Sequence, residues 1–193
     1  MADYRYNFDH RDCEGREGLS YNQLLDLTDV ESSGEILDEP VTLDEAKNFC
    51  KIDINESEEN DLIQSLITAA RLMCEEYSNI LFIKRQVVAV INNGNGGFFL
   101  TGPVGDIVSV EDIEGNTIPV ENYKLSGNLW KQLIYPRLHN IVITYYAGYE
   151  VLPENLKTAL LNAIYFLYDN RSQGTDNIGP IATLLLKPVR RVW

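Results

Sequence analysis

Residues that could do chemistry are few in this chain, and their spacing forms no recognisable site. His10 and His139 are far apart, and neither has Cys, Asp or Glu at the spacing of a zinc site. The cysteines, Cys13, Cys50 and Cys74, form no C-x-x-C pair, and three of them do not make a disulfide framework. The sequence therefore predicts no metal site, and it favours a reducing compartment.

Adjacent carboxylates and a glycine-rich stretch also fail to form a catalytic arrangement. Glu58-Glu59 and Glu75-Glu76 are sequence neighbours, so on a helix the members of each pair point to different sides and are expected to be solvated. Residues 92–97 are rich in glycine but lack the Gly-Lys-Ser/Thr ending of a phosphate-binding loop, which favours a hairpin tip. A Gly-x-Ser-x-Gly nucleophile elbow is also missing. The chain is predicted to be no enzyme and to use no cofactor.

Acidic residues are concentrated at the start of the chain, whose formal net charge is −13. Residues 1–61 hold 18 acids against 5 bases, whereas residues 62–193 hold 11 of each. This balance argues against wrapping nucleic acid, because phosphate neutralisation needs clusters of Lys and Arg. It suits either a solvated face that keeps the protein soluble or a surface that repels DNA and lets it pass.

Membrane and export signals are not found in the sequence. No stretch approaches the roughly 20 apolar residues that span a bilayer. The first residues, Met1–Arg5, lack an apolar signal core. A protein that is soluble and intracellular when made, without membrane contact, is expected.

Two helices are expected before residue 79. Thr42 and Glu45 have the spacing of a capping box, which predicts a short helix near 43–51. Carboxylates between Asn55 and Glu59 favour the start of a second helix, near 58–78. The apolar residues of this second helix follow a 3.6-residue period and predict a core face: Leu62, Ile63, Leu66, Ile67, Ala70, Met73, Cys74 and Tyr77.

Runs of β-branched and aromatic residues replace the helical period over residues 82–146. Short strands are expected at Phe82–Ile91, Gly97–Leu100, Ile107–Ile113, Leu129–Tyr135 and Ile141–Tyr146. The expected connectors are Asn92–Gly96, Thr101–Pro103, Glu114–Asn116 and Pro136–Leu138. Because the pieces are short and closely spaced, antiparallel hairpins are expected, in a small β-sheet or β-sandwich inserted between helices.

A third helix is expected at residues 153–171, where Pro153 suits the first turn. Its main apolar stripe is Leu156, Ala159, Leu160, Ala163, Ile164, Leu167 and Tyr168. Leu161, Tyr165 and Phe166 fall outside this stripe, so the helix is apolar on more than one face. Such a helix is buried either in its own domain or against a neighbour, and the small size of the domain favours the neighbour. These three residues are the candidates for contact between subunits.

Both ends of the chain have the composition of extended arms. Residues 1–39 hold 11 acids and few branched aliphatics, and they are expected to be either disordered or docked. Residues 172–193 form a tail with three leucines in a row, a terminal Trp and three bases. This tail should dock, either on a partner or across the subunit's own surface. The expected fold is α+β, with a helical core at 40–171 and a β insertion at 82–146.

An ordered series of motifs resembles the head-to-tail connector (adaptor, head-completion) family of tailed phages. In chain order these motifs are Val41–Lys47, Glu58–Ile63, Ile67–Arg71, Glu75–Tyr77, Leu100–Val104, Val142–Tyr149, and Pro153 with Leu156, Ala159, Ala163 and Asn170-Arg171. The resemblance covers most of the chain, from residue 40 to about residue 190. The acidic residues 1–39 depart from the compact start of that family.

The resemblance implies a structural subunit of a ring, typically dodecameric, that sits beneath the portal in the virion neck and forms part of the DNA channel. Its partners would be further copies, the portal protein and a stopper or tail-completion protein, while DNA passes without specific binding. The family's C-terminal segment engages the portal, which makes the portal-contact candidates Leu184, Leu185, Leu186, Arg190, Arg191 and Trp193. The candidate channel-facing acids of the first two helices are Asp53, Glu56, Glu58 and Glu59.

Three alternatives remain open at this point. A neck stopper or tail-completion protein would be mostly strands with less helix. A terminase small subunit would need a DNA-binding helix-turn-helix, which the acidic first third does not offer. An isolated enzyme domain would need a convergent polar site.

Overall fold

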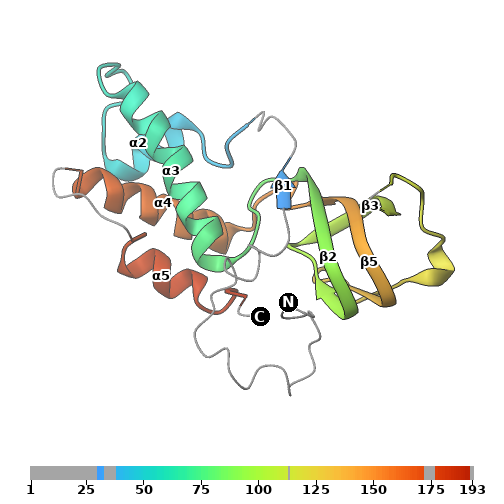
Figure 1. Ribbon diagram of the computed structural model, residues 1–193. Coiled ribbons are helices and arrows are strands. Elements are labelled where there is room, and N and C mark those ends of the chain that lie inside the picture. The colour runs from blue at the N-terminus through green and yellow to red at the C-terminus, as the bar shows by residue number, and fades with distance from the viewer. Residues whose placement is uncertain (1–29, 33–37, 113, 172–176, 192–193) are drawn as a thin grey trace. The chain divides into compact units, whose positions relative to one another are not determined.

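Residues 30–32, 38–112, 114–171 and 177–191 are described by the computed structural model shown in Figure 1. They fall into two units. A sheet unit contains Lys84–Gly148 together with the short strand at residues 30–32, and a helical unit contains Ile36–Ile83 and Tyr149–Val192. The chain is therefore α+β, as expected. Within the described ranges, no helix is long and apolar enough to cross a membrane.

The helical unit contains α2 (Leu43–Cys50), α3 (Asn60–Ser78), α4 (Glu154–Asp169) and α5 (Pro180–Leu186). The capping box that starts α2 is confirmed. The Thr42 hydroxyl accepts a hydrogen bond from the Glu45 amide at 3.2 Å, and the Thr42 amide donates to the Glu45 carboxylate at 3.0 Å. Each group satisfies an amide that a helix start leaves without a partner. The first three helices confirm the helical core that the sequence predicts.

The apolar stripes of α3 and α4 form the core of the helical unit. In α3, Ile63, Ile67, Ala70 and Cys74 are fully buried, whereas Leu62 at the helix start is 39% exposed. In α4, the residues of the main stripe from Leu156 to Leu167 are at most 8% exposed. Helical periodicity thus identified the buried faces, because residues three or four apart lie on one side of a helix.

The sheet unit is one antiparallel sheet with β5 (Gln132–Ala147) at its centre. Strands β2 (Arg85–Phe99) and β3 (Val104–Asp112) lie on either side of β5. Strand β1 (Val30–Ser32) pairs with β2, and β4 (Lys124–Ser126) pairs with the first part of β5. The sequence predicts neither of these two short strands. Their three-residue length gives no period to detect.

Two of the expected connectors are wrong, since Asn92–Gly96 and Pro136–Leu138 lie inside strands β2 and β5. The pairing explains why, because these segments face each other across the ladder, with Gly94 opposite Leu138. A register shift between Gly94 and Gly96 absorbs the irregularity. Cross-strand hydrogen bonding therefore overrides the local turn preference of Asn, Gly and Pro. The other two connectors, at residues 101–103 and 114–116, do lie between strands.

Candidate functional site

The acids proposed for the channel lie in the loop between α2 and α3, and not on the two helices. Lys47 holds the backbone of this loop in place. Its buried ammonium group donates hydrogen bonds to the backbone carbonyl of Ile54 at 3.2 Å and to that of Glu56. A buried ammonium group needs such acceptors. Asp53, Glu56 and Glu58 are exposed. The loop therefore exposes three carboxylates to solvent, while the buried Lys47 side chain stabilises its backbone.

Glu59 has a different environment from the other loop acids. Its carboxylate accepts hydrogen bonds from the Tyr168 hydroxyl at 2.5 Å and from the Arg171 guanidinium at 3.0 Å. Arg171 also lies over the Tyr168 ring, 4.5 Å from its centroid. The hydrogen bond to Glu59 raises the pKa of Tyr168. Glu59 thus joins the start of α3 to the end of α4 inside the subunit, and its charge is neutralised there.

The three residues proposed for contact between subunits are placed differently from one another. Leu161 is half-buried. Phe166 packs within the unit, where its ring lies 2.6 Å from the place that a Cβ atom on Gly179 would occupy. Tyr165 is 44% exposed and makes an edge-to-face contact with Phe49 of α2, with ring centroids 6.4 Å apart. Phe49 is itself 38% exposed, although its spacing in α2 favours the core. The exposed pair is therefore Phe49 and Tyr165.

The tail contains a helix, α5, that the sequence analysis missed. The signal was available, because Pro180 occupies the first helical turn and Ala182 and Leu186 are four residues apart. Both Ala182 and Leu186 are fully buried, so Leu186 belongs to the core of the unit and is removed from the portal-contact candidates. Leu184 is 69% exposed, and Leu185 is half-buried.

The segment after α5 lies across the subunit's own surface. The amide of Arg191 donates to the carbonyl of Ser78 at 2.9 Å, and the Asn79 side chain donates to the carbonyl of Arg191 at 2.6 Å. The Arg190 guanidinium lies over the Tyr77 ring, 4.7 Å from its centroid. These contacts attach the tail to the end of α3. Trp193 lies outside the described residues.

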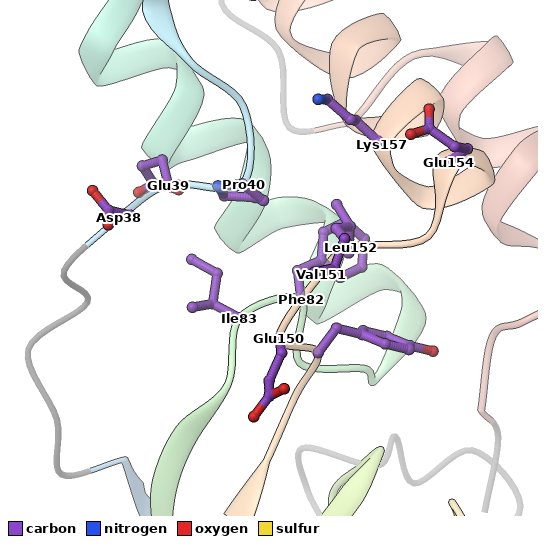
Figure 2. Close-up of a pocket in the computed structure, with 11 residues that line it drawn as sticks. Asp38, Glu39, Pro40, Phe82, Ile83, Glu150, Val151, Leu152, Glu154 and Lys157 are labelled. Atoms are coloured by element: carbon purple, nitrogen blue, oxygen red, sulfur yellow. The ribbon is translucent and has the colours of Figure 1, made fainter.

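A cleft of 260 Å³ opens in the helical unit. Figure 2 shows the side chains that line it. Its lining comes from the segment before α2, the turn after α3 and the start of α4. The lining residues are Asp38, Glu39, Pro40, Phe82, Ile83, Tyr149, Glu150, Val151, Leu152, Glu154 and Lys157. Apolar side chains occupy the inner part, since Phe82 is 1% and Leu152 is 8% exposed, while Val151 is 85% exposed at the rim. No local sequence pattern could reveal the cleft, because its three segments are far apart in the chain.

A buried ionic network fixes two walls of the cleft. Arg71, which is 2% exposed, binds Glu39 at 2.8 Å and Glu75 at 3.1 Å. The Glu75 carboxylate also accepts a hydrogen bond from the amide of Phe82 at 2.7 Å. The prediction that Glu75 is solvated is therefore wrong, because its side chain is only 6% exposed. Through this network α3 holds both the segment before α2 and the turn at residue 82.

The base in the cleft, Lys157, also has an acidic partner. Its ammonium group binds the Glu45 carboxylate at 2.5 Å, which ties the start of α4 to α2. This hydrogen bond, followed by the one from the Thr42 amide, lowers the pKa of Glu45 below its ordinary value. Lys157 is therefore neutralised by a residue outside the cleft lining.

Catalytic or metal-binding groups do not gather at these surfaces. Over the described ranges, no group of three or more His, Cys, Asp and Glu side chains is placed to hold a metal ion. Cys74 is fully buried in α3, and burial raises the pKa of its thiol to about 12, which makes it inert. The distinctive features of the chain are surfaces: an acidic loop, an exposed aromatic pair, an anchored basic tail and an acidic cleft.

The chain belongs to the head completion protein family, whose model matches residues 39–179. Its role is therefore a structural one in head completion. None of the curated proteins compared with it matches.

Solved structures share the fold of this chain. A chain in the neck of the empty gene transfer agent (GTA) particle, computed with C6 symmetry, matches with a TM-score of 0.68 and 17% identity, over 86% of this chain and 96% of that one. A chain of the native GTA virion matches with a TM-score of 0.67 and 15% identity, over 85% and 96%. The neck of the native particle, computed with C12 symmetry, gives a TM-score of 0.66 and 16% identity, over 86% and 96%.

Proposed function

We propose that this chain is a connector subunit that forms a ring beneath the portal in the neck of a virion and surrounds part of the DNA channel. The observation that carries the proposal is the shared fold over 86% of the chain with a subunit of GTA necks computed with C6 and C12 symmetry. Membership of the head completion protein family supports the same role. The four helices among the described residues favour a connector over a stopper, for which mostly strands are expected.

The acidic loop supports a position beside passing DNA. Asp53, Glu56 and Glu58 are exposed there, whereas Glu59 is occupied by Arg171 and Tyr168. Carboxylates repeated around a ring would repel phosphates, so DNA would slide without being held. The proposed channel-facing set is therefore Asp53, Glu56 and Glu58.

Portal contact is proposed for the C-terminal segment. Arg190 is exposed and held in place by Tyr77, which makes it the first candidate of the described residues. Arg191 is anchored to α3 beside it. Leu184 and Leu185 are at least partly exposed to solvent and remain candidates for portal contact. Leu186 is buried in the core of the subunit. Deletion of residues 181–193 would be a poor test of portal contact, because it would also remove Ala182 and Leu186, which are buried.

The exposed aromatic pair supports contact between subunits. Phe49 and Tyr165 come from α2 and α4, and an edge-to-face pair on a surface resembles the aromatic anchors of protein interfaces. Replacing Tyr165 with Ser should weaken ring formation and leave the fold intact, since the side chain is 44% exposed.

The proposed function is tested by mixing the purified chain with the portal protein of the same virus and counting copies in the complex by native mass spectrometry and cryo-EM. The expected result is a closed ring of this chain on one end of the portal. Arg190→Glu should reduce portal binding, while the loss of the cation over Tyr77 should lower the free energy of unfolding by only about 0.5–1 kcal/mol. A portal that binds no copies, or only single copies, would contradict the proposal.

A further inference from the structure

The cleft of the helical unit is smaller than a site for a free cofactor or substrate. Its 260 Å³ lies below the roughly 300 to 1,000 Å³ of small-molecule sites. Its inner wall is apolar, with Phe82 and Leu152 nearly fully buried. A space of this kind fits one or two apolar side chains that project from a protein segment.

The charge of the cleft restricts which segment fits. Four carboxylates line it, from Asp38, Glu39, Glu150 and Glu154, against the one base, Lys157. Arg71 neutralises Glu39, and Glu45 neutralises Lys157. The rim also carries the carboxylates of Asp38 and Glu154, which lie on opposite sides of the cleft in Figure 2, so it stays acidic. An occupant should carry bases beside its apolar side chains, and no acids.

One described segment of this chain has those properties. Residues 180–191 contain three bases and no acid. On α5, Ile181 is 56% and Leu184 is 69% exposed, and Lys187 follows three residues after Leu184. This spacing places Ile181, Leu184 and Lys187 on one outward face of the helix. An apolar helix face with a base at its end suits an apolar groove with an acidic rim.

The occupant must come from a second copy, because α5 cannot leave its own subunit. Ala182 and Leu186 are in the core, and Arg191 is hydrogen-bonded to Ser78 and Asn79. We propose that the outward face of α5, formed by Ile181, Leu184 and Lys187, docks into the acidic cleft of the next copy of this chain.

This contact joins two unlike surfaces, which is the head-to-tail arrangement that closes into a ring. The inference rests on the proposed function, which supplies the ring. It assigns Leu184 to the neighbouring copy, and it leaves Arg190 and the residues after it for the portal. In the ring, one neighbour fills the cleft of each subunit, and the other neighbour receives the outward face of its α5.

The test is a charge exchange between copies of the full-length chain. Glu154→Lys places like charges at the contact within a solution of that variant, and so does Lys187→Glu. A one-to-one mixture of the two variants can alternate around a ring with every pair of charges opposite. We therefore expect each variant alone to associate about fivefold more weakly than the wild type, and we expect the mixture to recover the wild-type strength.

Chemical crosslinking captures weak contacts, so the contact between α5 and the cleft can be tested even if the chain forms no stable rings in solution. In a background with Cys13→Ser and Cys50→Ser, copies carrying Glu154→Cys are mixed with copies carrying Lys187→Cys and treated with a short thiol-reactive crosslinker. The mixture should give dimers, and neither variant alone should. Glu76→Cys replaces Glu154→Cys as the control, because Glu76 is an exposed acid of α3 outside the cleft.

Equal crosslinking with Glu76→Cys, no crosslinking in the mixture, or no recovery in the charge exchange would each overturn the proposal. Copy counting on the portal separates this failure from that of the proposed function. If rings form on the portal but the charge exchange does not change association between copies, only the cleft contact is rejected. A portal without multiple copies rejects the ring itself.

Discussion

Arg71 is a buried charge on which two separate chain segments depend. It holds Glu39 before α2 and Glu75 within α3, and its side chain is 2% exposed. Arg71→Met would leave both carboxylates without their cation in a poorly hydrated site. We expect the free energy of unfolding to fall by about 3–5 kcal/mol, measured by urea denaturation.

A matched control for that substitution is Arg190→Met, which removes an exposed arginine that lies over Tyr77. Its expected loss is about 0.5–1 kcal/mol, the contribution of an exposed cation over an aromatic ring. Equal losses in the two variants would show that the ionic network does not hold the segments together.

Glu45 gives the helical unit a specific dependence on pH. Its bond to Lys157 lowers its pKa below the ordinary value of 4.5. A folded pKa below the unfolded one means that the contribution to stability is fully present above pH 4.5 and is lost as the pH falls through the folded pKa. The contribution is modest, because the Glu45 side chain is 41% exposed and screened by solvent.

The expected result is a smaller loss of unfolding free energy on acidification for Glu45→Gln than for the wild type. Denaturation curves at a series of pH values below 6 measure it. Lys157→Met, which removes the largest cause of the pKa shift, should flatten the acid dependence in the same direction. An acid dependence that neither substitution changes would refute this role of the pair.

At the scale of elements, α5 has two faces with different tasks. On one face of α5, Leu186 is fully buried in the core of its own subunit. On the other face, Leu184 is 69% exposed. Leu186→Ala should lower the free energy of unfolding by about 2–5 kcal/mol because it leaves a cavity. Leu184→Ala should change it by less than about 0.5 kcal/mol. Urea denaturation of the isolated chain measures both, and a large loss for Leu184→Ala would mean that its side chain is buried.

At the scale of the whole molecule, the uneven charge governs contact with nucleic acid. With 29 acids against 16 bases, the chain should not bind duplex DNA at moderate salt, since binding requires phosphate neutralisation. Fluorescence anisotropy of a labelled duplex should stay constant when the chain or its ring is added. Stable association would contradict the channel role, whereas Asp53→Lys with Glu56→Lys should introduce salt-sensitive binding to the ring.

Features that depend on residues close along the chain could be predicted from the sequence alone. The capping box at Thr42 and Glu45, the buried stripes of α3 and α4, and the gathering of acids before residue 62 follow from local spacing and composition. The family resemblance also rests on short motifs, and the match to the head completion protein family confirms it.

Features that depend on contacts between distant segments became visible in the folded chain and not before. Pairing between β2 and β5 converted two expected turns into strand, because ladder hydrogen bonds outweigh local turn preference. Burial took Leu186 from the docking candidates, and Glu59 found its partners more than 100 residues away, in Tyr168 and Arg171. The acidic cleft exists only because three separate segments meet. Sequence spacing cannot report such contacts, since they are fixed by the packing of whole elements.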